Sequence, residues 1–70
     1  MIKIKKFRNR KLYTNGRYIT LKEFAELVIE GNKVVVRDYN ENNITSTTIK
    51  KAFARGDLTY AELGKALNEE

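Results

Sequence analysis

The chain has 70 residues, with 14 Lys or Arg against 9 Asp or Glu, which gives a formal net charge of +5. It has no cysteine and no histidine, which excludes disulfide bonds and thiolate zinc sites and removes the commonest general base, so we expect no metal, no cofactor and no enzyme activity. No apolar stretch approaches the roughly 20 residues that span a bilayer, and we expect a cytoplasmic protein with a single domain over residues 1–70.

The N-terminal segment predicts two short strands that form a hairpin. Ile2 and Ile4 alternate with lysines, a pattern typical of a strand with one apolar face. Residues 12–14 form the second strand. Two turn signals stand nearby, Asn9 between the strands and the Asn15-Gly16 pair after them, and both residue types tolerate a positive φ. The sequence leaves open which of these two places carries the main reversal of the chain.

A helix is predicted over residues 21–30. Thr20 and Glu23 form a capping box, in which each side chain accepts a hydrogen bond from the backbone amide of the other residue. Ile19 and Phe24 flank this turn as a hydrophobic staple. Apolar residues then recur at helical spacing, so one face of the helix is expected to pack against the rest of the domain.

The second half of the chain predicts a strand, a short returning strand and two helices. They cover residues 33–39, 44–45, 46–55 and 59–68. The first helix of this half is expected to be capped by Thr45 or Ser46, and the last by a second capping box, Thr59 with Glu62. The whole pattern predicts an α+β domain, in which a small antiparallel sheet of the N-terminal hairpin and strand 33–39 packs with about three helices.

Positive charge is concentrated at the N-terminus. Residues 1–17 carry seven Lys or Arg and no acidic residue, whereas the remainder has seven Lys or Arg against nine Asp or Glu. The seven are Lys3, Lys5, Lys6, Arg8, Arg10, Lys11 and Arg17. Such a division indicates a surface that meets a polyanion. The alternative is a solvated strand edge, where lysines prevent sheets from joining edge to edge.

If the polyanion is DNA, the basic residues divide by chemistry. Arginine presents a rigid donor fork that suits guanine O6 and N7, so Arg8 and Arg10 are the candidates for base contacts. The lysines suit phosphate positioning, and they are Lys3, Lys5, Lys6 and Lys11. Arg17 could add a phosphate contact. Lys50, Lys51 and Arg55 would extend this surface if the 46–55 helix packed beside the N-terminal segment, and would otherwise form a solvated helix face.

Three further residue types in the segment have two interpretations each. Asn9 could bind adenine or phosphate, but we favour a role in which its side chain holds a tight turn. Tyr13 and Tyr18 could contact the DNA backbone or stack on a base, but we expect at least one of them to pack in the core. Phe7 could be a stacking platform, but we expect it in the core as well.

The order of residues in the segment resembles a known family. Residues 5–14, Lys5-Lys6-Phe7-Arg8-Asn9-Arg10-Lys11-Leu12-Tyr13-Thr14, are similar to the signature K-K-Y-x-N-R-R-L-Y-D-T of the polyhydroxyalkanoate synthesis regulators. Four later blocks match in order, namely residues 17–23, 30–31, 34–38 and 43–45. The resemblance covers about residues 3–53. It departs at Lys11, where Arg is usual, after Tyr13, where an acidic residue is usual, and at Ser46, where Arg is frequent.

The resemblance implies the DNA-binding domain of a bacterial transcriptional regulator, with double-stranded DNA as its partner. We expect a repressor that occupies an operator, and a homodimer because operators are commonly two-fold. The candidate DNA-binding residues are Lys3, Lys5, Lys6, Arg8, Asn9, Arg10, Lys11, Tyr13 and Arg17. An alternative is a protein-interaction module whose basic N-terminal strand adds to the sheet of an acidic partner. RNA binding is a third reading, weakened because no array of aromatic residues on one sheet face is evident.

Overall fold

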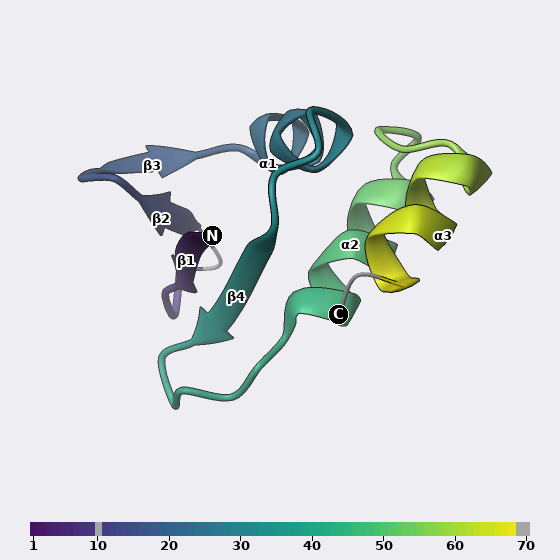
Figure 1. The fold of residues 1–70 in the computed structure, drawn as a ribbon. Helices are drawn as coiled ribbons and strands as arrows, with labels where there is room; N and C mark the ends of the chain where they lie inside the picture. The colour runs from purple at the N-terminus through teal and green to yellow at the C-terminus, as the bar shows by residue number, and fades with distance from the viewer. Residues whose placement is uncertain (10, 69–70) are drawn as a thin grey trace.

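A computed structural model describes residues 1–9 and 11–68 of the chain. The elements in chain order are β1 (Ile2–Lys6), β2 (Leu12–Thr14), β3 (Arg17–Ile19), α1 (Leu21–Ile29), β4 (Val34–Asp38), α2 (Thr45–Ala54) and α3 (Tyr60–Asn68). The strands form one sheet, and the helices lie together on one side of it (Figure 1). This arrangement confirms the predicted α+β class.

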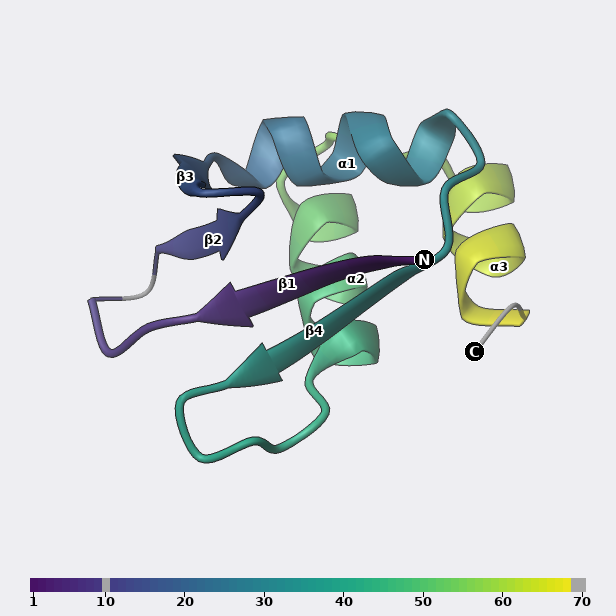
Figure 2. The same ribbon diagram turned by 60° about the vertical axis from the view of Figure 1, so that its left-hand side comes forward.

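The sheet is mixed rather than antiparallel. Its strand order is β3-β2-β1-β4, with antiparallel pairs between β1, β2 and β3 but a parallel pair between β1 and β4. The prediction of an antiparallel sheet is therefore wrong for β4. The reason is that α1 serves as a crossover, which returns the chain to the same end of the sheet before β4 begins, as parallel pairing requires (Figure 2).

Both predicted turns reverse the chain, so the N-terminal hairpin has a third strand that the sequence did not reveal. The first turn separates β1 from β2 around Arg8 and Asn9. The second is a two-residue turn between β2 and β3, where Asn15 has φ 52° and Gly16 has φ 80°. Consecutive positive φ values are typical of the hairpin turns that match strand twist.

The core lies between the sheet and the helices. Alternate residues of the strands point into it, so that Ile4, Leu12 and Val36 are buried. Phe24 of α1 and Ile49 of α2 cover them from the other side, and Phe24 and Val36 have no exposed surface. Both predicted capping boxes are confirmed, and the two residues of the predicted staple, Ile19 and Phe24, belong to the buried core. In the first box, Thr20 Oγ1 accepts from the Glu23 amide at 3.1 Å, and Glu23 Oε1 accepts from the Thr20 amide at 3.1 Å.

The beginning of α2 differs from the prediction. No returning strand forms over residues 44–45, because α2 already begins at Thr45, and neither Thr45 nor Ser46 occupies the cap position. Instead, Asn43 Oδ1 accepts hydrogen bonds from the Thr45 amide at 3.0 Å and from its hydroxyl at 2.7 Å. The Thr45 hydroxyl oxygen in turn accepts from the Val36 amide of β4 at 2.9 Å. The start of α2 therefore provides a hydrogen-bond acceptor for a backbone amide on the outer edge of β4.

Removal of the Thr45 hydroxyl is expected to destabilise the domain. Thr45→Val keeps the side-chain shape but leaves the buried Val36 amide without an acceptor, which costs about 1–3 kcal/mol. A domain of this size rarely has more than about 3–5 kcal/mol in total, so urea unfolding followed by circular dichroism should show a large fall in midpoint. Thr47→Val, at an exposed position of the same helix, is the control. Equal midpoints for the two variants would contradict the assigned role.

Candidate nucleic-acid interface

The lysines of β1 are divided between the two faces of the sheet. Successive strand residues point to opposite sides, so Lys3 and Lys5 lie on the face away from the helices, whereas Lys6 lies on the helix side. We call the first side, which carries no helix, the open face. The N-terminal charge therefore forms two surfaces instead of the single surface that the sequence indicated.

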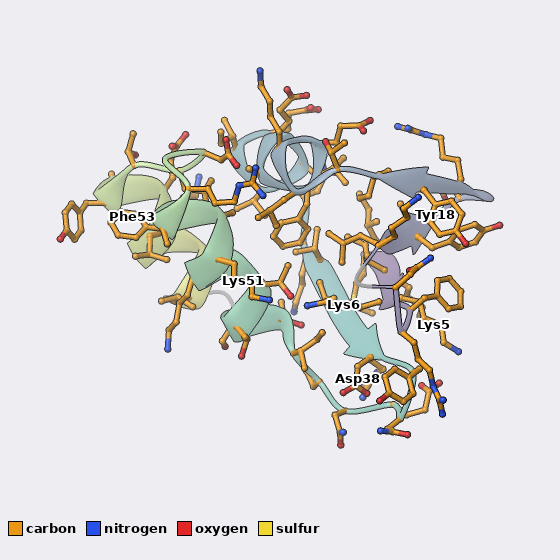
Figure 3. All side chains as sticks on the ribbon, turned by 180° about the vertical axis from the view of Figure 1, so that it is seen from behind. Lys5, Lys6, Tyr18, Asp38, Lys51 and Phe53 are labelled. Carbon is orange, nitrogen blue, oxygen red and sulfur yellow. The ribbon has the colours of Figure 1, made fainter. Side chains whose placement is uncertain are left out.

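A groove at one end of the sheet brings together four basic residues from distant parts of the chain. It has a volume of about 480 Å³ and lies between the sheet and α2. Its cations are Lys6, Lys11, Lys51 and Arg55, which together define what we call the basic groove. Figure 3 shows Lys6 and Lys51 pointing toward each other across it. Among the described residues that line it, none is acidic, so the groove is suited to an anion.

Two of the three basic residues that the sequence placed on the 46–55 helix line the basic groove. Lys51 of α2 and Arg55, the residue that caps its C-terminus, lie beside the N-terminal segment, as expected if this helix extends the basic surface. Lys50 is exposed on the same helix but does not line the groove. The surface of the N-terminal segment is thus extended by α2.

The open face carries an aromatic cluster, contrary to the expectation that Phe7 and at least one of the two tyrosines would enter the core. The rings of Phe7, Tyr13 and Tyr18 meet edge to face, with centroids 5.2 Å apart for the two tyrosines and 5.6 Å and 6.2 Å from Phe7 to each. None of the three is buried. The cause is strand alternation, because Leu12 and Ile19 point inward and the residue beside each of them must point outward.

The turn between β1 and β2 is held by the residue that we favoured for this role. Asn9 Oδ1 accepts a hydrogen bond from the Lys11 amide at 3.1 Å, which confirms its structural interpretation. The Arg8 guanidinium lies 4.7 Å from the centroid of the Tyr39 ring, a cation–π contact. Arg10, the second candidate for base contacts, lies outside the described residues.

Arg17 lies in a different electrostatic environment from the other candidates. Its guanidinium donates to Glu23 Oε2 at 3.0 Å, and Glu26 of α1 and Glu30, the residue after this helix, line the same hollow. The hydrogen bond from the Thr20 amide, followed by that from Arg17, lowers the pKa of Glu23. These neighbouring carboxylates oppose the approach of a phosphate, and a DNA contact by Arg17 stays a prediction.

A second turn is organised by Asp38 at the end of β4. Its Oδ1 accepts from the Asn40 and Asn42 amides, both at 2.9 Å, and its Oδ2 accepts from the Asn42 side chain at 3.3 Å. These bonds fix the loop that carries Tyr39, on which Arg8 lies.

Two residues of these surfaces were not anticipated from sequence, Tyr39 beneath Arg8 and Arg37 on the open face. In a strand, the residue after the apolar Val36 points to the opposite face, which was the available signal for Arg37. That signal became useful only when the pairing of Arg37 with Lys5 was known.

Residues 1–9 and 11–68 hold neither a metal-binding cluster nor a membrane-spanning helix. No cluster of acidic side chains there could hold a metal ion. None of the described helices has the length and apolar character needed to cross a membrane.

Comparisons with known proteins give one match. A family model described as the PHB/PHA accumulation regulator DNA-binding domain matches residues 3–57. The matched segment runs from β1 to the turn after α2, and so contains every residue of the basic groove and of the open face described above. No curated protein and no solved structure shows a significant match to the chain.

The Asp38 turn is expected to make stability depend on pH. Hydrogen bonds, first that from the Asn42 amide, lower the pKa of Asp38 below its ordinary value of 3.8. A lowered pKa in the folded state stabilises the fold above pH 3.8, and this contribution is lost as the pH falls through the lower folded value. Asp38→Asn should be less stable than wild type at pH 6, with the difference shrinking below pH 3.8 in thermal unfolding experiments. A difference that stays constant over this range would contradict the assignment.

Proposed function

Because the chain belongs to the PHB/PHA accumulation regulator DNA-binding domain family, a family of DNA-binding regulator domains, we propose that it is a repressor that holds duplex operator DNA in its basic groove. The observation that carries this proposal is the convergence of Lys6 and Lys11 with Lys51 and Arg55. Two segments far apart in sequence supply cations to one concave surface. A surface of this kind suits the closely spaced phosphates of a duplex.

The shape of α2 is compatible with this role. The exposed side of α2 and its C-terminal cap carries small and basic residues, namely Thr47, Lys50, Lys51, Ala54 and Arg55. Small side chains let a helix approach closely, and a B-form major groove admits a helix. In the proposed complex the basic residues of α2 and of the groove hold phosphates, while Arg8, at the tip of the first turn, reaches a base edge.

The sequence suggested that Lys3 and Lys5 position phosphates, but in this proposal they lie outside the basic groove. They project from the open face, on the side of the sheet opposite Lys6. A duplex held in the basic groove therefore meets Lys6 and Lys11 directly, and Lys3 and Lys5 contribute to the general positive field.

The alternative of strand addition by β1 loses its structural basis. β1 lies inside the sheet, with β2 on one side and β4 on the other, so it offers no edge to a partner strand. On the outer edge of β4, Val36 is already bonded to the start of α2, through Thr45 and Ile44. The other edge strand of the described sheet is β3, which has three residues and no lysine.

A dimer is supported by the size of the domain. The half-sites of a two-fold operator lie about 34–36 Å apart on the same side of the duplex. The longest extent of the domain is 29 Å, so one copy does not span two half-sites. Sedimentation velocity with a palindromic duplex is expected to show two copies per duplex. A single copy that occupied the whole operator at saturation would argue against a dimer.

The central proposal predicts a change in salt dependence. The double variant Lys51→Ala with Arg55→Ala should weaken binding to random and promoter-derived duplexes alike. It should also reduce the slope of log K against log salt by up to about 1.8, since each phosphate contact contributes about 0.9. Fluorescence anisotropy at several salt concentrations measures both effects. Lys65→Ala on α3, which removes a charge outside the groove, is the control. The proposal fails if both variants behave alike.

Arg8 should act on sequence discrimination instead. Arg8→Ala is expected to reduce the preference for operator over random duplex by about 1–3 kcal/mol, the usual value of a bidentate base contact. Arg8→Lys retains the charge but not the donor fork, so it should lose discrimination and keep most of the non-specific affinity. If Arg8→Lys kept full discrimination, Arg8 would be a charge contact and not a reader of bases.

A further inference from the structure

One row of side chains crosses the open face, with one residue from each of the four strands. Tyr18 pairs with Tyr13, Tyr13 with Lys5, and Lys5 with Arg37. The row therefore joins an aromatic pair to a cationic pair. Figure 3 shows Lys5 and Tyr18 on the same side of the sheet, directed away from the helices.

The aromatic half of the row is accessible to a ligand. No helix covers this face (Figures 1 and 2), and Tyr18 is 52% exposed. Lysine ammonium groups lie close to the rings, with Lys11 Nζ 5.5 Å from the centroid of Tyr18 and Lys5 Nζ 6.0 Å from that of Phe7. Flat rings beside mobile cations are the elements with which proteins bind unpaired bases and the adjoining phosphates.

The cationic half of the row is electrostatically unfavourable without a ligand. Lys5 and Arg37 lie directly opposite each other on neighbouring strands, and like charges in such positions destabilise a sheet. Glu41 compensates in part, with its Oε1 3.4 Å from Lys5 Nζ and its backbone oxygen accepting from Arg37 at 3.1 Å. The Lys5–Glu41 pair is exposed, and an exposed ion pair contributes little. An anion over the row would relieve this repulsion.

We infer that the open face binds single-stranded DNA, with bases stacked at Tyr13 and Tyr18 and phosphates beside Lys5 and Arg37. The hollow on this side has a volume of about 660 Å³ and is lined by Lys3, Lys5, Tyr13 and Arg37 among others. Stacking on a side-chain ring needs a base that is free of its duplex. The open face is thus a binding site for a different form of nucleic acid from the duplex assigned to the basic groove.

Charge argues against a second copy of the chain as the occupant. Two open faces packed together would place Lys3, Lys5 and Arg37 of each copy against a surface of the same sign, which opposes association. The choice of DNA over RNA rests on the family and on the proposed function. Lys11 and Tyr18 line the basic groove as well as contacting each other beside the open face, so a strand that leaves a bound duplex has a continuous path between the two surfaces.

Paired binding experiments test the inference. Labelled oligothymidylate and a labelled duplex are titrated with wild type, Tyr13→Leu and Lys5→Ala at low salt. Tyr13→Leu should weaken single-strand binding about tenfold, as expected for loss of one stacked base, and leave duplex binding within about twofold. Lys51→Ala with Arg55→Ala should show the opposite pattern. Tyr60→Leu, which removes a ring that is 81% exposed on α3, should change neither.

A spectroscopic measurement detects stacking directly. The chain has four tyrosines and no tryptophan, so tyrosine emission is observable, and bases stacked on the open face should quench it in wild type and in Tyr60→Leu. Quenching should be strongly reduced in Tyr13→Leu. Circular dichroism verifies that the variant is folded, and Lys5→Ala provides a second test of the face that does not remove a ring.

Four outcomes would overturn the inference. They are the absence of single-strand binding at low salt, equal loss of duplex and single-strand binding in folded Tyr13→Leu, tighter binding of oligouridylate than of oligothymidylate, and dissociation of a homodimer by Tyr13→Leu in sedimentation. Because duplex binding is measured in the same series, failure at the open face is distinguished from failure of the basic groove.

Discussion

The parallel pairing of β1 with β4 is the constraint on which the rest of the structure depends. It sets Ile4 opposite Val36, and both side chains are buried. The most basic segment of the chain is therefore held in the middle of the sheet, where its apolar residues form core and its lysines project to either side. The same register places Lys5 beside Arg37 on one face. Both charged surfaces follow from this one pairing.

Features specified by short-range interactions were predictable from the sequence. The box of Thr20 and Glu23 involves residues three apart, and the Asn15-Gly16 turn needs only the backbone freedom of two residues. Features set by distant segments were not. The direction of β4 depends on the path of α1. The role of Thr45 depends on the Val36 amide of β4, which has no partner strand and donates to the Thr45 hydroxyl, and no local pattern reveals this bond.

The candidate site shows the same division. Strong positive charge in the first seventeen residues was evident, but its separation into two surfaces depends on which residues of β1 face the core. At least one of Tyr13 and Tyr18 was expected in the core. Each is turned outward by an apolar neighbour that takes the inner position, Leu12 and Ile19. Strand register, which the composition of a three-residue strand does not specify, decided the position of both rings.

The hydrogen bond between Thr45 and Val36 has a consequence for the thermodynamics of association. It attaches the first residue of α2 to β4, so the helix that carries Lys51 cannot swing away from the sheet without breaking a buried bond. The backbone that carries Lys51 is thus tied to the sheet before any ligand arrives. A helix that is already in place has less conformational entropy to lose on binding, so less of the attraction between the groove and an anion is spent on ordering α2.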